Sequence, residues 1–209
     1  MIPEQDFAMA AKSAIGTSIF VFMFGVAIFV PKWDMFAYAS SMGIAICFLS
    51  VTIANESFVI SSKRMYSRFS IAFAIIYCTL VWIVYYTQLS FVRMAASPSS
   101  KEVLSIVAYT PGSAFFALDI LGYFFMSLSV FFLALTMDTA LLLRKLLMAM
   151  GLWGGTCIAA PLLPFFYEQQ QSNDSDAVGI IALSLWSMLF CPLMIMLAKH
   201  YREQGKKID

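Results

Sequence analysis

One aspartate, Asp119, lies about eight residues inside the apolar run that starts at Pro111, which is roughly 12 Å along a helix. At that depth in hydrocarbon a carboxylate costs about 2.5–3.5 kcal/mol, so it needs protein or water beside it and a polar partner. Such a group can bind a proton or a cation, anchor a polar solute, or join two helices by hydrogen bonds. The sequence leaves these three uses open.

Partners for this carboxylate are found in the same run and in the apolar run before it. Tyr85 and Gln88 lie near the end of the preceding run, which returns to the same membrane face. Tyr123 lies one helical turn beyond Asp119 on the same side of the helix. Arg93 joins the set if its side chain reaches inward. We therefore expect these residues to form a ligand-binding or ion-binding pocket in the outer half of the membrane.

Enzymatic and metal chemistry find no support in the residue pattern. The chain has no H-E-x-x-H or G-x-S-x-G motif and no pair of mid-span aspartates, which argues against an intramembrane protease or hydrolase. Its one histidine, His200, follows the last apolar run and is expected to be solvated at the membrane surface. The cysteines lie singly in four different runs and are expected to pack as small apolar side chains: Cys47, Cys78, Cys157 and Cys191. We predict no catalytic residue, metal or cofactor.

The elements that must position Asp119 and its partners are six long apolar runs. Hydrophobic residues make up 61% of the 209 positions, and charged residues only 12%. A helix needs about 20 apolar residues to cross a bilayer, and these runs are too long for barrel strands. We predict an all-α polytopic membrane protein, a six-transmembrane-helix bundle forming one domain over residues 1–209. The expected spans are 7–30, 35–60, 69–92, 111–137, 146–167 and 177–198. Thr110 and Pro111 fit the N-cap and first residue of the fourth span.

Basic residues are distributed unequally between the two membrane faces. The face that carries both termini of a six-span chain has ten of the thirteen Lys and Arg residues: Lys12, Lys63, Arg64, Arg68, Arg144, Lys145, Lys199, Arg202, Lys206 and Lys207. The other face has Lys32, Arg93 and Lys101. Short cytoplasmic loops are enriched in Lys and Arg, so we expect both termini to be cytoplasmic.

Two spans carry small residues at four-residue spacing, which permits close helix packing. Gly151 and Gly155 form such a face on the fifth span, and Ala39 and Gly43 form one on the second. These faces fit a contact within the chain or between subunits equally well. Asn55 and Glu56 are expected to form ion pairs at the membrane surface with Lys63 and Arg64.

The longest connection between spans has the pattern of a short surface helix. Ser99 and Glu102 have the spacing of a capping box, and apolar residues follow them. A helix here would lie above the Asp119 pocket.

Three stretches carry a resemblance to known sequences. The stretch 85–93 (YYTQLSFVR), the stretch 110–113 (TPGS) and the stretch 117–128 (ALDILGYFFMSL) resemble segments of a group of uncharacterised small bacterial membrane proteins. A weaker resemblance continues from residues 143–147 into the last span. It implies a bacterial plasma membrane and six helices, and it brings no assigned activity.

The sequence therefore predicts a non-enzymatic membrane protein that binds a small molecule, a lipid or a partner chain within its helix bundle. One alternative is a small proton- or cation-coupled transporter or channel that uses Asp119. Another is an accessory subunit of a larger membrane complex. The expected partners are the lipid bilayer and either a second copy of the chain or a larger complex, and no nucleic acid.

Overall fold

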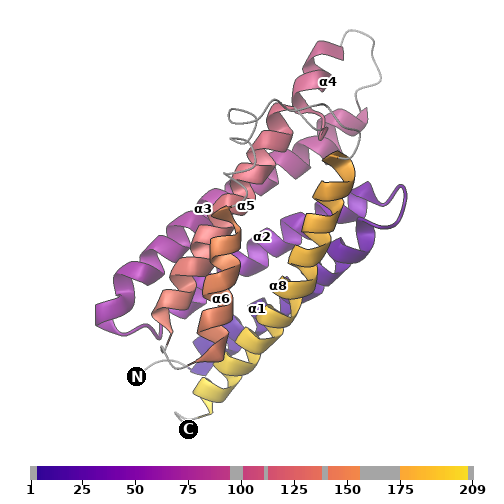
Figure 1. Cartoon of the computed structure of the whole chain (residues 1–209). Helices are drawn as coiled ribbons and strands as arrows, with labels where there is room; N and C mark the ends of the chain where they lie inside the picture. The colour runs from indigo at the N-terminus through magenta and orange to yellow at the C-terminus, as the bar shows by residue number, and fades with distance from the viewer. Residues whose placement is uncertain (1–3, 95–100, 111–112, 138–140, 156–174, 207–209) are drawn as a thin grey trace.

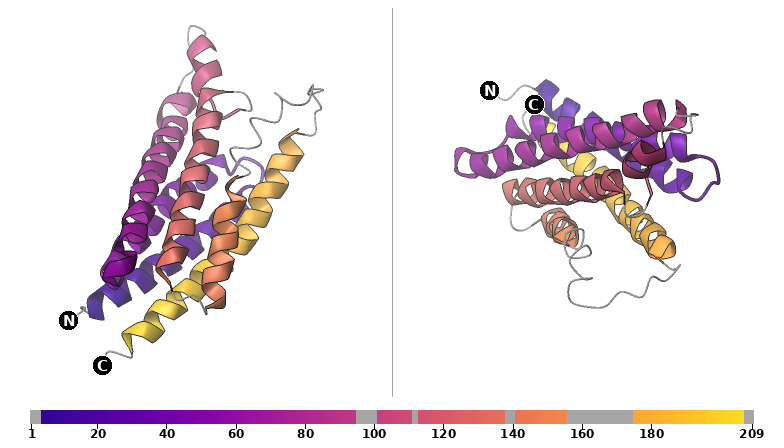
Figure 2. Two further views of the ribbon diagram at one scale, coloured as in Figure 1. Left: turned by 60° about the vertical axis from the view of Figure 1, so that its left-hand side comes forward. Right: turned by 90° about the horizontal axis from the view of Figure 1, so that it is seen from above.

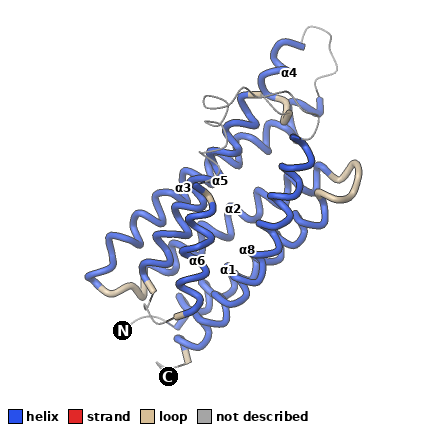
Figure 3. Tube along the Cα trace, viewed as in Figure 1, coloured by secondary structure: helices blue, strands red, loops and turns tan. Residues whose placement is uncertain are grey.

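The structure is a computed structural model that describes residues 4–94, 101–110, 113–137, 141–155 and 175–206. Within these ranges the chain is helical, with no strand (Figure 3). Five of the described helices are long and apolar enough to cross a membrane: Gln5–Ala27, Asp34–Glu56, Ser61–Val92, Ala114–Thr136 and Leu183–Gly205. The predicted all-α membrane protein is confirmed at this level. The predicted fifth span, 146–167, lies largely outside the described residues, so the sixth crossing stays a prediction.

The helices form one elongated bundle (Figure 1). Helix α1 (Glu4–Ala27) packs against α2 (Asp34–Glu56) and against the last helix, α8 (Ser175–Gly205). Helix α3 (Arg64–Thr87) lies between α2 and α5 (Ala114–Thr136). Helix α1 begins and α8 ends at the same end of the bundle, which we call the termini end (Figures 1 and 2).

Two short segments lie at opposite ends of α3, and two further helices complete the described chain. The 3-10 turn η1 (Ser61–Lys63) precedes α3, and the π-helix η2 (Gln88–Val92) continues it. Helix α4 (Lys101–Val107) stands at the end opposite the termini, which we call the α4 end (Figure 1). Helix α6 (Leu142–Trp153) packs against α5 and touches α8.

Most predicted span boundaries differ from the observed ones by only a few residues. Helix α2 ends at Glu56 instead of residue 60, and α3 begins at Arg64 instead of residue 69. The predicted N-cap of the fourth span is wrong. Ser113, not Thr110, is the N-cap of α5, because its hydroxyl accepts a hydrogen bond from the Phe116 amide at 3.1 Å. Pro111 lies outside the described residues.

Glycines let the helices approach closely at both predicted small-residue faces. A Cβ on Gly43 would lie 2.7 Å from the Phe20 ring of α1, and one on Gly151 would lie 2.8 Å from the Phe131 backbone of α5. Both glycines therefore serve contacts within the chain. No such contact is seen for the other two members of these faces in the described part of the chain: Ala39 is exposed, and a Cβ on Gly155 would meet no described atom within 4 Å.

Two serines join α3 to α5 in the buried middle of the bundle. The Ser70 hydroxyl donates to the Ser129 carbonyl at 2.9 Å, and the Ser129 hydroxyl donates to the Ser70 carbonyl at 2.7 Å. Gly122, farther along α5, is in ordinary van der Waals contact with Leu80 and Val81. This tight pairing of α3 with α5 fixes the two helices that carry Tyr85, Gln88 and Asp119.

Candidate functional site

Asp119 lies in the second turn of α5 and is only 2% exposed. Its Oδ2 atom accepts two hydrogen bonds, from the Tyr85 hydroxyl at 3.0 Å and from the Tyr109 hydroxyl at 2.8 Å. Tyr85 comes from α3, as expected, and Tyr109 comes from the segment that follows α4. The carboxylate therefore ties together three elements near the α4 end of the bundle.

Gln88 holds the segment that delivers Tyr109. Its side chain is 5% exposed; its Nε2 donates to the Val107 carbonyl at 2.7 Å, and its Oε1 accepts from the Tyr109 amide at 2.9 Å. Gln88 is also the first residue of the π-helix η2, a form that is rare and frequent at functional sites. The structure thus places Gln88 beside the site as a support for Tyr109, with no hydrogen bond to Asp119 itself.

The short helix predicted above the pocket is present as α4, Lys101–Val107. Ser99, the predicted cap of this helix, lies outside the described residues. The chain turns back into the bundle after Val107, so Tyr109 reaches Asp119 from above. Burial, and next the Asp119 carboxylate, raise the pKa of the Tyr109 phenol above its ordinary value, which keeps its hydroxyl a donor.

Aromatic rings surround the Asp119 carboxylate. Tyr38 of α2 stacks on Tyr85 with ring centroids 5.2 Å apart and meets Tyr109 edge-on at 6.1 Å. Tyr85 and Tyr109 are themselves 5.8 Å apart. Rings with electron-rich faces suit a cation, and they exclude water from the carboxylate.

The second carboxylate oxygen of Asp119, Oδ1, is buried and has no hydrogen-bond partner among the described residues. Arg93, which was considered as a partner of Asp119, does not bond to Oδ1. Arg93 is exposed and forms no ion pair in the described part of the chain. Tyr123 is buried one turn below Asp119, with its ring 6.1 Å from that of Tyr77 and 5.4 Å from that of Trp186.

Sequence reasoning missed two members of the site, Tyr38 and Tyr109. Tyr38 lies five residues from Trp33 at the start of α2, so a comparison of depths would have put it level with Asp119. Tyr109 was treated as part of a surface connection. Only the return of the chain after α4 brings it to the carboxylate, and no local pattern encodes that return.

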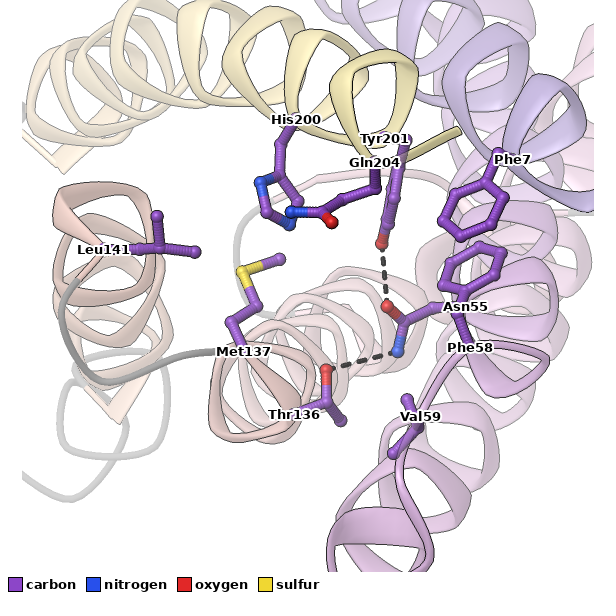
Figure 4. Close-up of a pocket in the computed structure, with 10 residues that line it drawn as sticks. All are labelled: Phe7, Asn55, Phe58, Val59, Thr136, Met137, Leu141, His200, Tyr201 and Gln204. Carbon is purple, nitrogen blue, oxygen red and sulfur yellow. Dashed lines mark hydrogen bonds between the residues drawn. The ribbon is translucent and has the colours of Figure 1, made fainter. Parts of the chain in front are cut away.

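A second cluster of polar residues occupies the termini end of the bundle. Asn55 is 4% exposed; its Nδ2 donates to the Thr136 hydroxyl at 3.2 Å and its Oδ1 accepts from the Tyr201 hydroxyl at 3.0 Å. The expected surface ion pairing of Asn55 is therefore wrong, because the side chain joins α2, α5 and α8. Glu56 pairs with Arg68 at 3.8 Å instead of Lys63 or Arg64. His200 is half-buried and lines a cavity at this end (Figure 4), so its expected solvation at the membrane surface stays a prediction.

No described group of three or more His, Cys, Asp and Glu side chains is placed to hold a metal ion. Comparison with known proteins gives no match to a protein family, a curated protein or a solved structure. The resemblance to small bacterial membrane proteins therefore stays a prediction. The polar clusters around Asp119 and around Asn55 are the features that bear on function.

Proposed function

We propose that this chain is a non-enzymatic integral membrane protein that binds a small positively charged ligand within its helix bundle, and that Asp119 holds it. The ligand is a proton or a small monovalent cation. The proposed setting is a bacterial plasma membrane with both termini in the cytoplasm. The ten basic residues expected on the termini side, against three on the other, support that orientation.

The observation that carries the proposal is the Oδ1 atom of Asp119, which is buried and has no hydrogen-bond partner among the described residues. An interhelical hydrogen-bonding role uses Oδ2 alone, which already receives both phenol hydroxyls. Buried polar atoms without a partner are uncommon and call for a proton, an ion or an ordered water. No basic side chain forms an ion pair with the carboxylate among the described residues, and Arg93 is exposed. A positive occupant at Oδ1 supplies the missing compensation.

The surroundings of the carboxylate favour a small occupant over a large one. Three tyrosine rings, those of Tyr38, Tyr85 and Tyr109, pack within 6.1 Å of one another beside it. The phenol oxygens of Tyr85 and Tyr109 lie within hydrogen-bonding distance of Oδ2 and can turn lone pairs toward a cation. A proton or a dehydrated monovalent ion fits such a setting.

A second candidate function, proton- or cation-coupled transport, is favoured by the way the site is closed. Tyr109 closes the site from the α4 end, and its backbone is held to η2, the continuation of α3, through Gln88. Displacement of this one segment would open the carboxylate to the solution at that end. Coupled transport requires such an opening, together with a second path toward the termini end.

Infrared spectroscopy of the protein in lipid nanodiscs tests the binding proposal. A protonated Asp119 contributes a carboxyl C=O band, which should fall as the pH is raised and as Na⁺ or K⁺ is added. The Asp119→Asn variant should lack this band and bind neither ion. Asp34→Asn, which changes an exposed carboxylate at the start of α2, should leave the band unchanged and serves as the matched control.

Stability separates the binding role from a purely structural one. The asparagine side chain still accepts hydrogen bonds from the two tyrosines, so Asp119→Asn should change the unfolding free energy by only about 0.6 kcal/mol, the average for an interhelical hydrogen bond. If the carboxyl band responds to neither pH nor cations, Asp119 is a helix-joining residue and the proposal is wrong.

A further inference from the structure

The buried face of α3 carries polar side chains through most of the thickness of the bundle. Its members are Ser67, Ser70, Tyr77 and Tyr85, each at most 2% exposed. Tyr85 is the residue that bonds to Asp119. From Ser67 to Tyr85 the helix rises about 27 Å, which is close to the roughly 30 Å of hydrocarbon in a bilayer. The interior of the bundle is therefore polar at intervals from the Asp119 site almost to the termini end.

Three hydroxyls in this interior have no hydrogen-bond partner among the described residues. They belong to Ser41 of α2 and to Ser67 and Tyr77 of α3, and each of these residues is 0% exposed. A partly exposed serine of α2 behaves differently, because the Ser50 hydroxyl donates to the Ile46 carbonyl one turn back at 2.9 Å. An unpaired buried hydroxyl costs about 1–3 kcal/mol, and an ordered water is the usual partner that removes this cost.

Ser41 lies about one turn below the carboxylate site on α2. It follows Tyr38, whose ring stacks on that of Tyr85, by three residues, or about 4.5 Å. Phe48 lies two turns farther along the same face of α2 and packs edge-on against Tyr77, with ring centroids 6.3 Å apart. The Ser41 hydroxyl is therefore at a depth between the carboxylate and Tyr77.

Tyr77 lies in the middle of the bundle against the helix that carries the carboxylate. Asp119 and Tyr123 of α5 are close enough to act electrostatically on its hydroxyl, as is Cys78 of its own helix. Helix α5 presents a glycine at this level, and a Cβ on Gly122 would lie 3.9 Å from the Tyr77 ring. Tyr77 therefore connects the depth of the carboxylate with the middle of the bundle.

Toward the termini end the series continues through paired serines to a cavity. Ser70 and Ser129 exchange hydrogen bonds between α3 and α5, and Ser67 lies about one turn below Ser70. Beyond them Asn55 and Thr136 are joined by a hydrogen bond and line a cavity of about 310 Å³ at the termini end (Figure 4). A cavity of this size has room for several water molecules, which can deliver or accept protons.

Aromatic packing in the middle of the bundle favours a proton over a metal cation as the species that moves. The Tyr77 ring lies 6.1 Å from the Tyr123 ring, and the Tyr123 ring lies 5.4 Å from that of Trp186 on α8. Rings at these distances are in contact. A hydrated ion needs a continuous passage, which such packing blocks. A proton needs only hydroxyls and single waters within hydrogen-bonding reach of one another.

We infer that the hydroxyls of Ser41, Tyr77 and Ser67, bridged by single bound waters, conduct protons between Asp119 and the termini end. This inference rests on the proposed function and deepens it, because it makes the ligand of Asp119 a proton. The carboxyl proton of Asp119 passes to the first oxygen and leaves a carboxylate. Each water or hydroxyl then accepts a proton on a lone pair and releases its own O–H proton to the next oxygen. One proton leaves at the far end for each that enters, and every hydroxyl ends neutral.

Proton flux into lipid vesicles tests this route. A pH step is applied across the membrane of vesicles that contain the protein, and a dye trapped inside reports proton entry. Tyr77→Phe keeps the ring and removes only the hydroxyl, so the protein should remain folded. The flux should fall about 100-fold, the lower end of what a positioned proton-transfer group contributes. Tyr86→Phe changes an exposed tyrosine of the same helix and should keep the parental flux.

The carboxyl infrared band separates the route from the binding proposal. Tyr77→Phe should leave the Asp119 band and its dependence on pH unchanged, because the Tyr77 hydroxyl forms no hydrogen bond among the described residues. If the parental band responds to pH but the parental protein carries no proton flux, the route is wrong and the binding site stands. Parental flux in Tyr77→Phe has the same meaning. A parental band that does not respond to pH overturns the binding site, and the route with it.

A serine pair on α2 gives a second, independent test. Ser41→Ala removes a hydroxyl of the route and should lower the proton flux. Ser50→Ala removes a hydroxyl that is bonded to its own helix and should leave the flux unchanged. If the two variants carry equal flux, the buried hydroxyls are not the path of the proton and the inference is wrong.

Discussion

Replacement of Gln88 by leucine should release the segment that closes the Asp119 site. The change removes both side-chain hydrogen bonds to that segment, to the Val107 carbonyl at 2.7 Å and from the Tyr109 amide at 2.9 Å. Leucine has a similar volume and fits a buried position, so α3 itself should remain folded. Tyr109 would then be held mainly by its hydroxyl bond to Asp119.

The expected size of the effect follows from the number of bonds lost. Hydrogen bonds between membrane helices are worth about 0.6 kcal/mol on average and at most about 1.7 kcal/mol, so the loss of two lowers the opening free energy by about 1–3 kcal/mol. Opening of the segment should therefore become about 5- to 150-fold more frequent. Hydrogen exchange at the Tyr109 amide reports loss of its bond to Gln88, and exchange at the Ala108 amide, which donates to the Leu104 carbonyl at 2.8 Å, reports opening of the segment.

Thr87→Ala is the matched control for this experiment. Thr87 precedes Gln88, but among the described residues its hydroxyl bonds only to the Ile83 carbonyl of its own helix. Exchange at Tyr109 should be unchanged in this variant. If the Gln88→Leu protein is folded and its Tyr109 amide exchanges at the parental rate, Gln88 does not hold the segment, and the account of how the site is closed is refuted.

Two further predictions concern packing and topology. Gly151→Leu should destabilise the contact of α6 with α5 and lower the yield of folded protein, because any side chain there meets the Phe131 backbone. Gly155→Leu should leave that contact intact. Equal yields of the two variants would contradict this prediction. A reporter that is active only outside the cytoplasm should give signal when inserted at Gln171 and none when fused after Asp209, and the reverse pattern would overturn the proposed orientation.

The helical membrane fold was predictable because hydrocarbon leaves the backbone few options. Long apolar runs define where helices lie, and Pro31 and the charged connections define where they stop. Helix boundaries were less predictable. Ser113 and Thr110 are both good N-caps, and only the observed bond to the Phe116 amide distinguishes them.

The site was predictable to the extent that depth alone determines it. Asp119, Gln88 and Tyr85 were selected because polar groups in hydrocarbon need partners, and the structure brings all three together. Contributions from elements distant in sequence were not accessible. The role of Asn55 depends on Tyr201, 146 residues later, and no pattern near Asn55 shows that α8 ends beside α2.

The hydrogen bonds that join Asn55 to Thr136 and Tyr201 also constrain the order in which the bundle can be completed during synthesis. Asn55 forms hydrogen bonds with Thr136, which is 81 residues later in the chain, and with Tyr201, which is 146 residues later. At about 5–20 residues per second, roughly 7–30 s pass between synthesis of Asn55 and synthesis of Tyr201. Throughout that interval the side-chain oxygen of Asn55 on α2 lacks its final hydrogen-bond donor. The early helices therefore wait in a provisional arrangement, and the arrival of α8 both completes the hydrogen bonding of α2 and fixes the packing of α1.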